Sequence, residues 1–88
     1  MKIIDNLKDG YQILKGSNIP SYKIDCEILM SQTLNISREE VLLNLEKEIK
    51  KEERGKYLNL ISRRTKNEPI AYIINSKNFW RDKFITNN

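Results

Sequence analysis

Side chains that commonly carry catalysis are scarce in this sequence, which has no histidine and a single cysteine, Cys26, among its 88 residues. Histidine is the commonest general base, the commonest metal ligand and the usual activator of a serine or cysteine nucleophile. A lone cysteine can form neither an internal disulfide nor a thiolate zinc site, and free cysteines are usually buried. We therefore expect Cys26 to be an inert core residue, and we expect no catalytic and no metal-binding residue in the chain.

The glycines do not form a cofactor motif either. Gly10, Gly16 and Gly55 are spread along the chain, so neither a dinucleotide-binding fingerprint nor a phosphate-binding loop can be written. We expect these residues to bind no cofactor.

Positive charge gathers in one segment, which is either a binding surface or an ordinary solvated helix face. The chain has a formal net charge of +4, and residues 46–66 contain eight Lys or Arg and four Asp or Glu. Such a segment suits an acidic protein surface or nucleic acid. The alternative is a solvated helix face, whose cations favour the helix dipole and in which Arg64 pairs with Glu68. The candidate contacts are four cations: Arg63, Arg64, Lys66 and Arg81.

The spacing of apolar residues predicts the helices that would hold these side chains. Apolar residues recur at intervals of three and four over residues 2–15, which predicts a helix that Gly16 ends in a left-handed conformation. Residues 22–34 alternate in places as a strand would, but they run without a turn signal for longer than most strands. Their broad apolar face predicts the central helix of a bundle, with Asn35 as its stop.

A capping box opens the next predicted helix, since Ser37 is followed three residues later by Glu40. We expect this helix to end near Glu46. A charged helix should follow over residues 48–66, in which Gly55 marks either a close helix contact or a soft spot. One or two further turns are expected over residues 70–74.

Aromatic residues then flank a polar pair near the end of the chain and predict a short hairpin. The residues of this cluster are Phe79, Trp80 and Phe84, around Arg81 and Asp82. The expected fold is therefore an all-α bundle of four to five helices followed by a short β-hairpin.

The most specific stretches of the sequence resemble a known family. They are Arg63-Arg64, then Glu68-Pro69-Ile70-Ala71-Tyr72-Ile73, then Phe79-Trp80 and Phe84, with Asp25-Cys26-Glu27-Ile28-Leu29 upstream. In their order and spacing they resemble the amino-terminal domain of the release-factor glutamine methyltransferases, the PrmC or HemK family.

The resemblance implies a division of labour between this chain and a catalytic domain that it lacks. It implies that residues 1–75 form a substrate-recognition domain and that residues 76–88 begin a hairpin linker to a methyltransferase domain. The parent would use S-adenosylmethionine to methylate the glutamine of the Gly-Gly-Gln motif in peptide chain release factors. The family's Gly-rich turn and its Asn-Pro-Pro-Tyr motif are missing here, so the fragment itself should be non-catalytic.

The partners implied by the resemblance are the release factor and the chain's own catalytic domain. Arg63, Arg64, Lys66 and Arg81 are then the candidate substrate contacts, and Phe79, Trp80 and Phe84 are candidate interdomain contacts. The apolar runs are far shorter than the ~20 residues that span a bilayer, and we expect a cytoplasmic monomer.

Two other functions remain open from the residues alone. A small basic helical domain could bind nucleic acid, but the basic segment has Tyr57 as its one aromatic residue, and no recognition helix can be placed. A free-standing protein adaptor would have a complete aromatic core and a natural end at Asn88.

Overall fold

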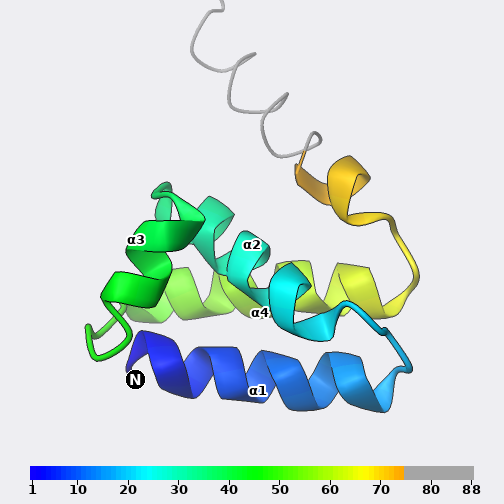
Figure 1. Cartoon of the computed structure of the whole chain (residues 1–88), viewed down its shortest axis with the longest axis horizontal. Helices are drawn as coiled ribbons and strands as arrows, with labels where there is room; N and C mark the ends of the chain where they lie inside the picture. Colours follow the sequence, from blue (N-terminus) through cyan, green and yellow to red (C-terminus); the bar gives the residue numbers. More distant parts are fainter. Residues whose placement is uncertain (75–88) are drawn as a thin grey trace, which may run out of the picture.

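The computed structural model describes residues 1–74, and these residues form an all-α bundle (Figure 1). Its helices are α1 (Ile3–Gly16), α2 (Tyr22–Leu34), α3 (Arg38–Leu43) and α4 (Lys51–Thr65). Residues 70–74 are helical as well. No strand occurs within residues 1–74, and the expected hairpin lies outside them. The expected all-α class is confirmed for the described part.

Helix α2 is the centre of the bundle, because α1, α3 and α4 all pack against it. Helices α1 and α4 run in the same direction, and α2, which packs against both, runs in the opposite direction (Figure 1). The central position of α2 confirms the prediction that was made from the broad apolar face of residues 22–34. The buried apolar side chains of α2 are Cys26, Leu29 and Met30, and those of α1 include Ile3, Leu7 and Leu14.

Two asparagines in the left-handed conformation end the first two helical segments. Asn35 has φ 61° and is the C-cap of α2, as its sequence position predicted. Gly16 was expected to play this part for α1, but the helix continues through it, and Asn18, at φ 63°, is the left-handed residue. Asparagine is one of the few residues with a side chain that tolerate this conformation.

The capping box before α3 is present as predicted. The backbone N–H of Glu40 donates to Ser37 Oγ at 3.1 Å, and the backbone N–H of Ser37 donates to Glu40 Oε1 at 3.0 Å. The helix ends at Leu43 instead of near Glu46, so the expected end was three residues too late.

Helix α4 begins at Lys51 rather than near Glu48, because the preceding loop is used to cap α1. The first N–H groups of a helix have no partner within it. Here Ile3 N–H donates to Lys47 O at 2.8 Å and Ile4 N–H donates to Leu45 O at 2.9 Å. The loop backbone cannot be helical while it makes these bonds, which shortens both neighbouring helices.

None of the helices in residues 1–74 is long and apolar enough to cross a membrane.

Candidate functional site

The predicted cations lie together where α4 ends, next to the beginning of α2 (Figure 1). Arg63 and Arg64 are in the last turn of α4, and Lys66 is its C-cap. The remaining candidates, Arg81, Phe79, Trp80 and Phe84, lie outside the described residues.

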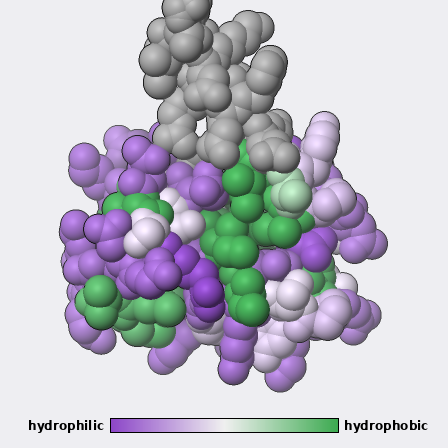
Figure 2. Space-filling view, turned by 45° about the horizontal axis from the view of Figure 1, so that its top comes forward, coloured by the Kyte–Doolittle hydropathy of each residue, from purple (hydrophilic) through white to green (hydrophobic). Residues whose placement is uncertain are grey.

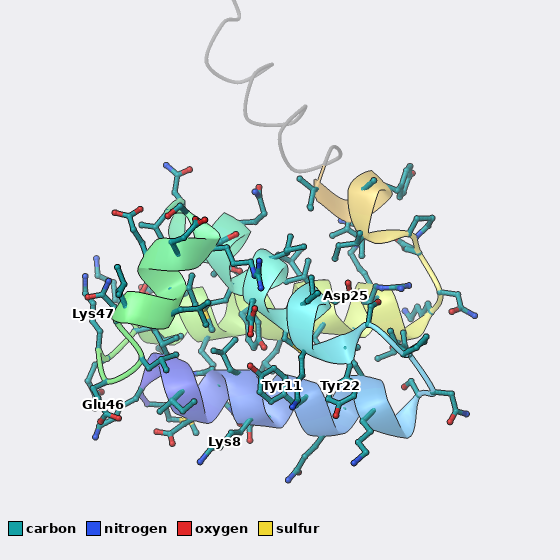
Figure 3. All side chains as sticks on the ribbon, in the orientation of Figure 1. Lys8, Tyr11, Tyr22, Asp25, Glu46 and Lys47 are labelled. Atoms are coloured by element: carbon teal, nitrogen blue, oxygen red, sulfur yellow. The ribbon has the colours of Figure 1, made fainter. Side chains whose placement is uncertain are left out.

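Arg64 is held inside the protein by a carboxylate of α2. Its Nε lies 2.8 Å from Asp25 Oδ2, and the two side chains are only 16% and 4% exposed. Asp25 also accepts a hydrogen bond of 2.9 Å from Ser21 Oγ, and it lies beside the last turns of α4 (Figure 3). The alternative pairing of Arg64 with the Glu68 carboxylate is therefore wrong, since the acidic partner of Arg64 is Asp25.

Glu68 is nevertheless held by both arginines. The Glu68 carbonyl oxygen accepts a 3.0 Å hydrogen bond from Arg64 Nη1, and its carboxylate pairs with Arg63 Nη2 at 2.9 Å. The arginine pair thus fixes the short connection between α4 and residues 70–74.

Lys66 is the member of this group whose charge faces solvent. Its side chain is exposed, and it forms no ion pair with any other residue in the range 1–74. Because Arg63 and Arg64 are neutralised by internal carboxylates, the surface is less positive than the sequence suggests. A phosphate backbone needs several free cations, and this site offers one among its described members.

The Asp25–Arg64 contact is the feature that sequence reasoning missed. The two residues are 39 positions apart, and no spacing rule pairs side chains over such a distance. A signal was present, because both residues fall in stretches that carry the family resemblance. That signal marked them as family features without saying that they touch.

A second carboxylate of α2 ties the other neighbouring helices to it. Glu27 accepts a hydrogen bond of 2.8 Å from Arg38 Nε and one of 3.4 Å from the Tyr11 hydroxyl. Tyr11 also meets Tyr22 edge to face, with ring centroids 6.1 Å apart (Figure 3). These contacts brace α1, α2 and α3 around the site.

Cys26 is a buried residue whose thiol is chemically inert. Its side chain is fully inaccessible to solvent, and this burial raises the pKa of the thiol to about 12. The thiolate is the nucleophilic form, so the residue is inert near neutral pH. No cluster of three or more potential metal ligands occurs in the described part of the chain.

Apolar side chains are also exposed near this end of the bundle. Ile24 on α2 is 50% exposed and Tyr72 is 60% exposed. Figure 2 shows a strip of hydrophobic residues across the middle of one face, with hydrophilic residues around it. Apolar surface bordered by polar residues is typical of contact with another protein or domain.

Comparison with known proteins identifies the domain. The family model of the PrmC N-terminal domain matches residues 5–74. A release factor glutamine methyltransferase of Leptospira interrogans is 36% identical over 97% of this chain and 30% of its own length. One of Clostridium botulinum is 39% identical over 90% of this chain and 28% of its own length.

A bifunctional methyltransferase of Rickettsia bellii is 35% identical over 92% of the chain and 15% of its own length. The chain thus spans less than a third of each of these relatives. No solved structure matches it. The family match covers all of the four helices except the first two residues of α1, together with the Asp25–Arg64 pair and the Glu68 connection. The chain belongs to the PrmC N-terminal domain family.

Proposed function

We propose that this chain is the release-factor-recognition domain of a protein-glutamine methyltransferase and that it does not transfer methyl groups itself. The observation that carries the proposal is the family match over residues 5–74, together with relatives named as release factor glutamine methyltransferases. Those relatives are more than three times longer than the matched part. The methyl transfer is assigned to residues beyond this chain.

The described residues do not fit S-adenosylmethionine, the methyl donor that the proposal requires. The partly open hollow between α2, α3 and α4 has a volume of about 200 Å³, whereas small-molecule sites usually measure ~300–1,000 Å³. The glycines are not clustered, so no backbone cradle is available for the donor. We therefore assign no catalytic step to this chain.

A separate recognition domain has a physical rationale. A single glutamine amide offers little surface for binding, so discrimination between protein substrates has to come from contacts remote from the reacting atom. Such contacts also hold the amide in the geometry that the reaction needs. A rigid helical bundle joined to a catalytic domain would supply them.

Within the domain, we assign substrate contact to Lys66 and the exposed edges around it. Arg63 is only partly exposed. Arg64 is largely buried, so we assign it a positioning role. Arg81 remains a proposed contact beyond the described residues. We likewise keep Phe79, Trp80 and Phe84 as proposed interdomain contacts. We add the exposed Ile24 and Tyr72 to the proposed interdomain contacts.

The proposal is tested by titrating the 88-residue chain with a peptide chain release factor and following its backbone amide resonances by NMR. We expect saturable shifts around Lys66, and a Lys66→Glu variant should bind at least threefold more weakly. Lys15→Glu is the matched control, because Lys15 is an exposed lysine in the last turn of α1. It should change the affinity less than twofold.

Two results would overturn the proposal. One is an absence of shifts at high micromolar release factor. The other is binding of random duplex DNA as tight as that of the release factor, which would instead favour the nucleic-acid function.

A further inference from the structure

A partly open hollow lies at the end of the bundle opposite to Lys66. It forms where the end of α2, helix α3, the loop before α4 and the first turn of α4 meet, and its volume is about 200 Å³. Lys47, in that loop, lies at the far end of the bundle from Asp25 (Figure 3). The apolar lining residues are Ile3, Leu34, Ile36 and Ile49, and the polar ones are Glu40, Asn44, Lys47, Glu48 and Glu53. We call it the Glu40–Glu53 hollow.

The charge around the hollow is opposite to that of the whole chain. Three acidic residues, Glu40, Glu48 and Glu53, line it together with Lys47. The N-terminal ammonium of Met1 pairs with Glu48 Oε1 at 3.2 Å. This leaves the carboxylates of Glu40 and Glu53 in excess over the ammonium of Lys47. The chain as a whole has a formal net charge of +4. The hollow therefore favours a cation, even though the domain as a whole attracts anions.

Two of these carboxylates are held in place before any partner arrives. Glu40 Oε1 accepts the Ser37 N–H at 3.0 Å, and Glu53 Oε1 accepts the Lys50 N–H at 2.8 Å. A carboxylate has two oxygens and about four acceptor positions, so each side chain can accept further hydrogen bonds. Little side-chain entropy would be lost on binding, because the two helix starts already order these groups.

The size and lining of the hollow define what fits it. It is smaller than a usual small-molecule site but can take one long side chain. The isoleucine and leucine residues of the lining suit an aliphatic stem, and its glutamates suit a cationic head. Arginine matches best, since its planar fork donates two hydrogen bonds to carboxylates and it is a common anchor of protein interfaces.

Helix α3 adds apolar surface for the residues on either side of such an arginine. Leu43 is 81% exposed and Leu42 is 41% exposed, and both lie between the hollow-lining Glu40 and Asn44 in the sequence. In a protein interface, an anchor residue in a pocket is typically surrounded by contacts that exclude water. The exposed leucines could make such contacts around a residue in the hollow.

We propose that the Glu40–Glu53 hollow is a docking site for an arginine side chain of the protein substrate, with flanking apolar residues of that substrate on Leu42 and Leu43. This deepens the proposed function and rests on it only for the identity of the partner, the release factor. The domain would then hold its substrate at two ends, at Lys66 and at the hollow.

Charge-removing variants that keep the fold provide the test. Gln replaces Glu in a capping box, so Glu40→Gln with Glu53→Gln removes two charges while the helix starts stay capped. The matched control is Glu39→Gln with Glu52→Gln, which makes the same change in the first turns of the same helices, on exposed residues that do not line the hollow. Both variants should give the circular dichroism spectrum of the wild-type chain, which checks that they stay folded.

Against the release factor, the hollow variant should bind at least fivefold more weakly, and the control variant should stay within twofold of wild type. Lys47→Gln should bind more tightly, because it removes a positive charge from the lining of the hollow. If the wild-type chain binds and the hollow variant binds equally well, the docking site is wrong while the proposed function stands.

A peptide arm tests the hollow without the release factor. Acetyl-Leu-Arg-Leu amide at millimolar concentration should shift the methyl resonances of Ile36 and Ile49, and the same peptide with citrulline in place of arginine should not. Equal shifts from both peptides, or none from either, would overturn the docking site. Methyl shifts without any binding of the release factor would support the hollow and contradict the proposed partner.

Discussion

At the scale of single residues, Gly10 decides how closely α4 can approach α1. A Cβ atom at this position would lie 2.2 Å from the Tyr57 hydroxyl oxygen and 2.9 Å from Cys26 Sγ. Atoms cannot come so close, so glycine is required for the packing of Tyr57 against both helices. Gly55 is the contrast, because a Cβ atom there would have no neighbour within 4 Å. Of the two sequence interpretations of Gly55, the soft spot fits and the close helix contact does not.

We predict opposite effects of alanine at these two glycines. Gly10→Ala should lower the free energy of unfolding by about 1–3 kcal/mol, because overpacking outweighs the better helix propensity of alanine. Gly55→Ala should raise it by about 0.5–1 kcal/mol. Urea unfolding followed by circular dichroism measures both. A stabilised Gly10→Ala variant would mean that α1 and α4 are not packed as described.

The buried thiol and phenols predict a loss of stability in alkali. Burial raises the pKa of Cys26 to about 12 and that of Tyr11 to about 12, and it also raises the pKa of Tyr57. In the unfolded chain these groups ionise from about pH 9–10, so from there upward the unfolded state releases protons that the folded state keeps. Unfolding is then favoured as the pH rises.

The urea midpoint should therefore fall between pH 9 and pH 12, and the effect of these groups should vanish below pH 8. Cys26→Ala should fall less steeply than wild type over the first part of this range. A midpoint that is constant up to pH 11 would contradict the burial of these groups.

At the scale of elements, side-chain hydrogen bonds close the starts of α3 and α4. The Ser37–Glu40 box begins α3, and Glu53 caps the backbone of Lys50 before α4. Only the first was predicted, because Ser is a recognised cap residue and Lys is not. The ends of α3 and α4 next to the loop were misplaced for a different reason, namely that the loop backbone serves α1.

Removing the predicted cap should loosen α3 specifically. Ser37→Ala should lower the free energy of unfolding by about 0.5–2 kcal/mol and speed amide hydrogen exchange in α3. Ser62→Ala, at an exposed position late in α4, should have little effect. Equal losses in the two variants would argue against a special role of the cap.

At the scale of the whole molecule, one buried ion pair joins α2 to the far end of α4. Asp25 and Arg64 are 39 positions apart in the sequence. Nevertheless, Asp25 Oδ2 and Arg64 Nε lie 2.8 Å apart. The Arg63–Glu68 pair nearby has side chains that are 30% and 33% exposed. Solvent weakens the second pair far more than the first.

We predict that Asp25→Asn lowers the free energy of unfolding by about 3–5 kcal/mol, because it leaves the Arg64 guanidinium without its buried partner. Glu68→Gln, which breaks the more exposed pair, should cost about 0.2–1 kcal/mol. Thermal unfolding of both variants compares them. Arg64→Gln with Asp25→Asn should cost less than the two single changes added together, and additive costs would contradict a direct pair.

The candidate substrate contacts also differ in whether they have a structural partner. Because Arg64 has a structural partner, its replacement would impair substrate binding through the fold, whereas Lys66 can be changed without disturbing an ion pair in residues 1–74. A binding study should therefore begin with Lys66. The Glu40–Glu53 hollow extends the search to the opposite end of the bundle.

The helices, the capping box at Ser37, the stop at Asn35 and the family could be predicted from the sequence, because each depends on neighbours a few residues apart or on a motif. Three contacts became visible when the helices were seen packed together: Arg64 meets Asp25, Gly10 faces Tyr57, and the loop after α3 caps α1. The packing also brings Glu40 and Glu53 around one hollow. These contacts join residues 13 to 47 positions apart, and whether they form depends on how the whole core packs rather than on any local preference.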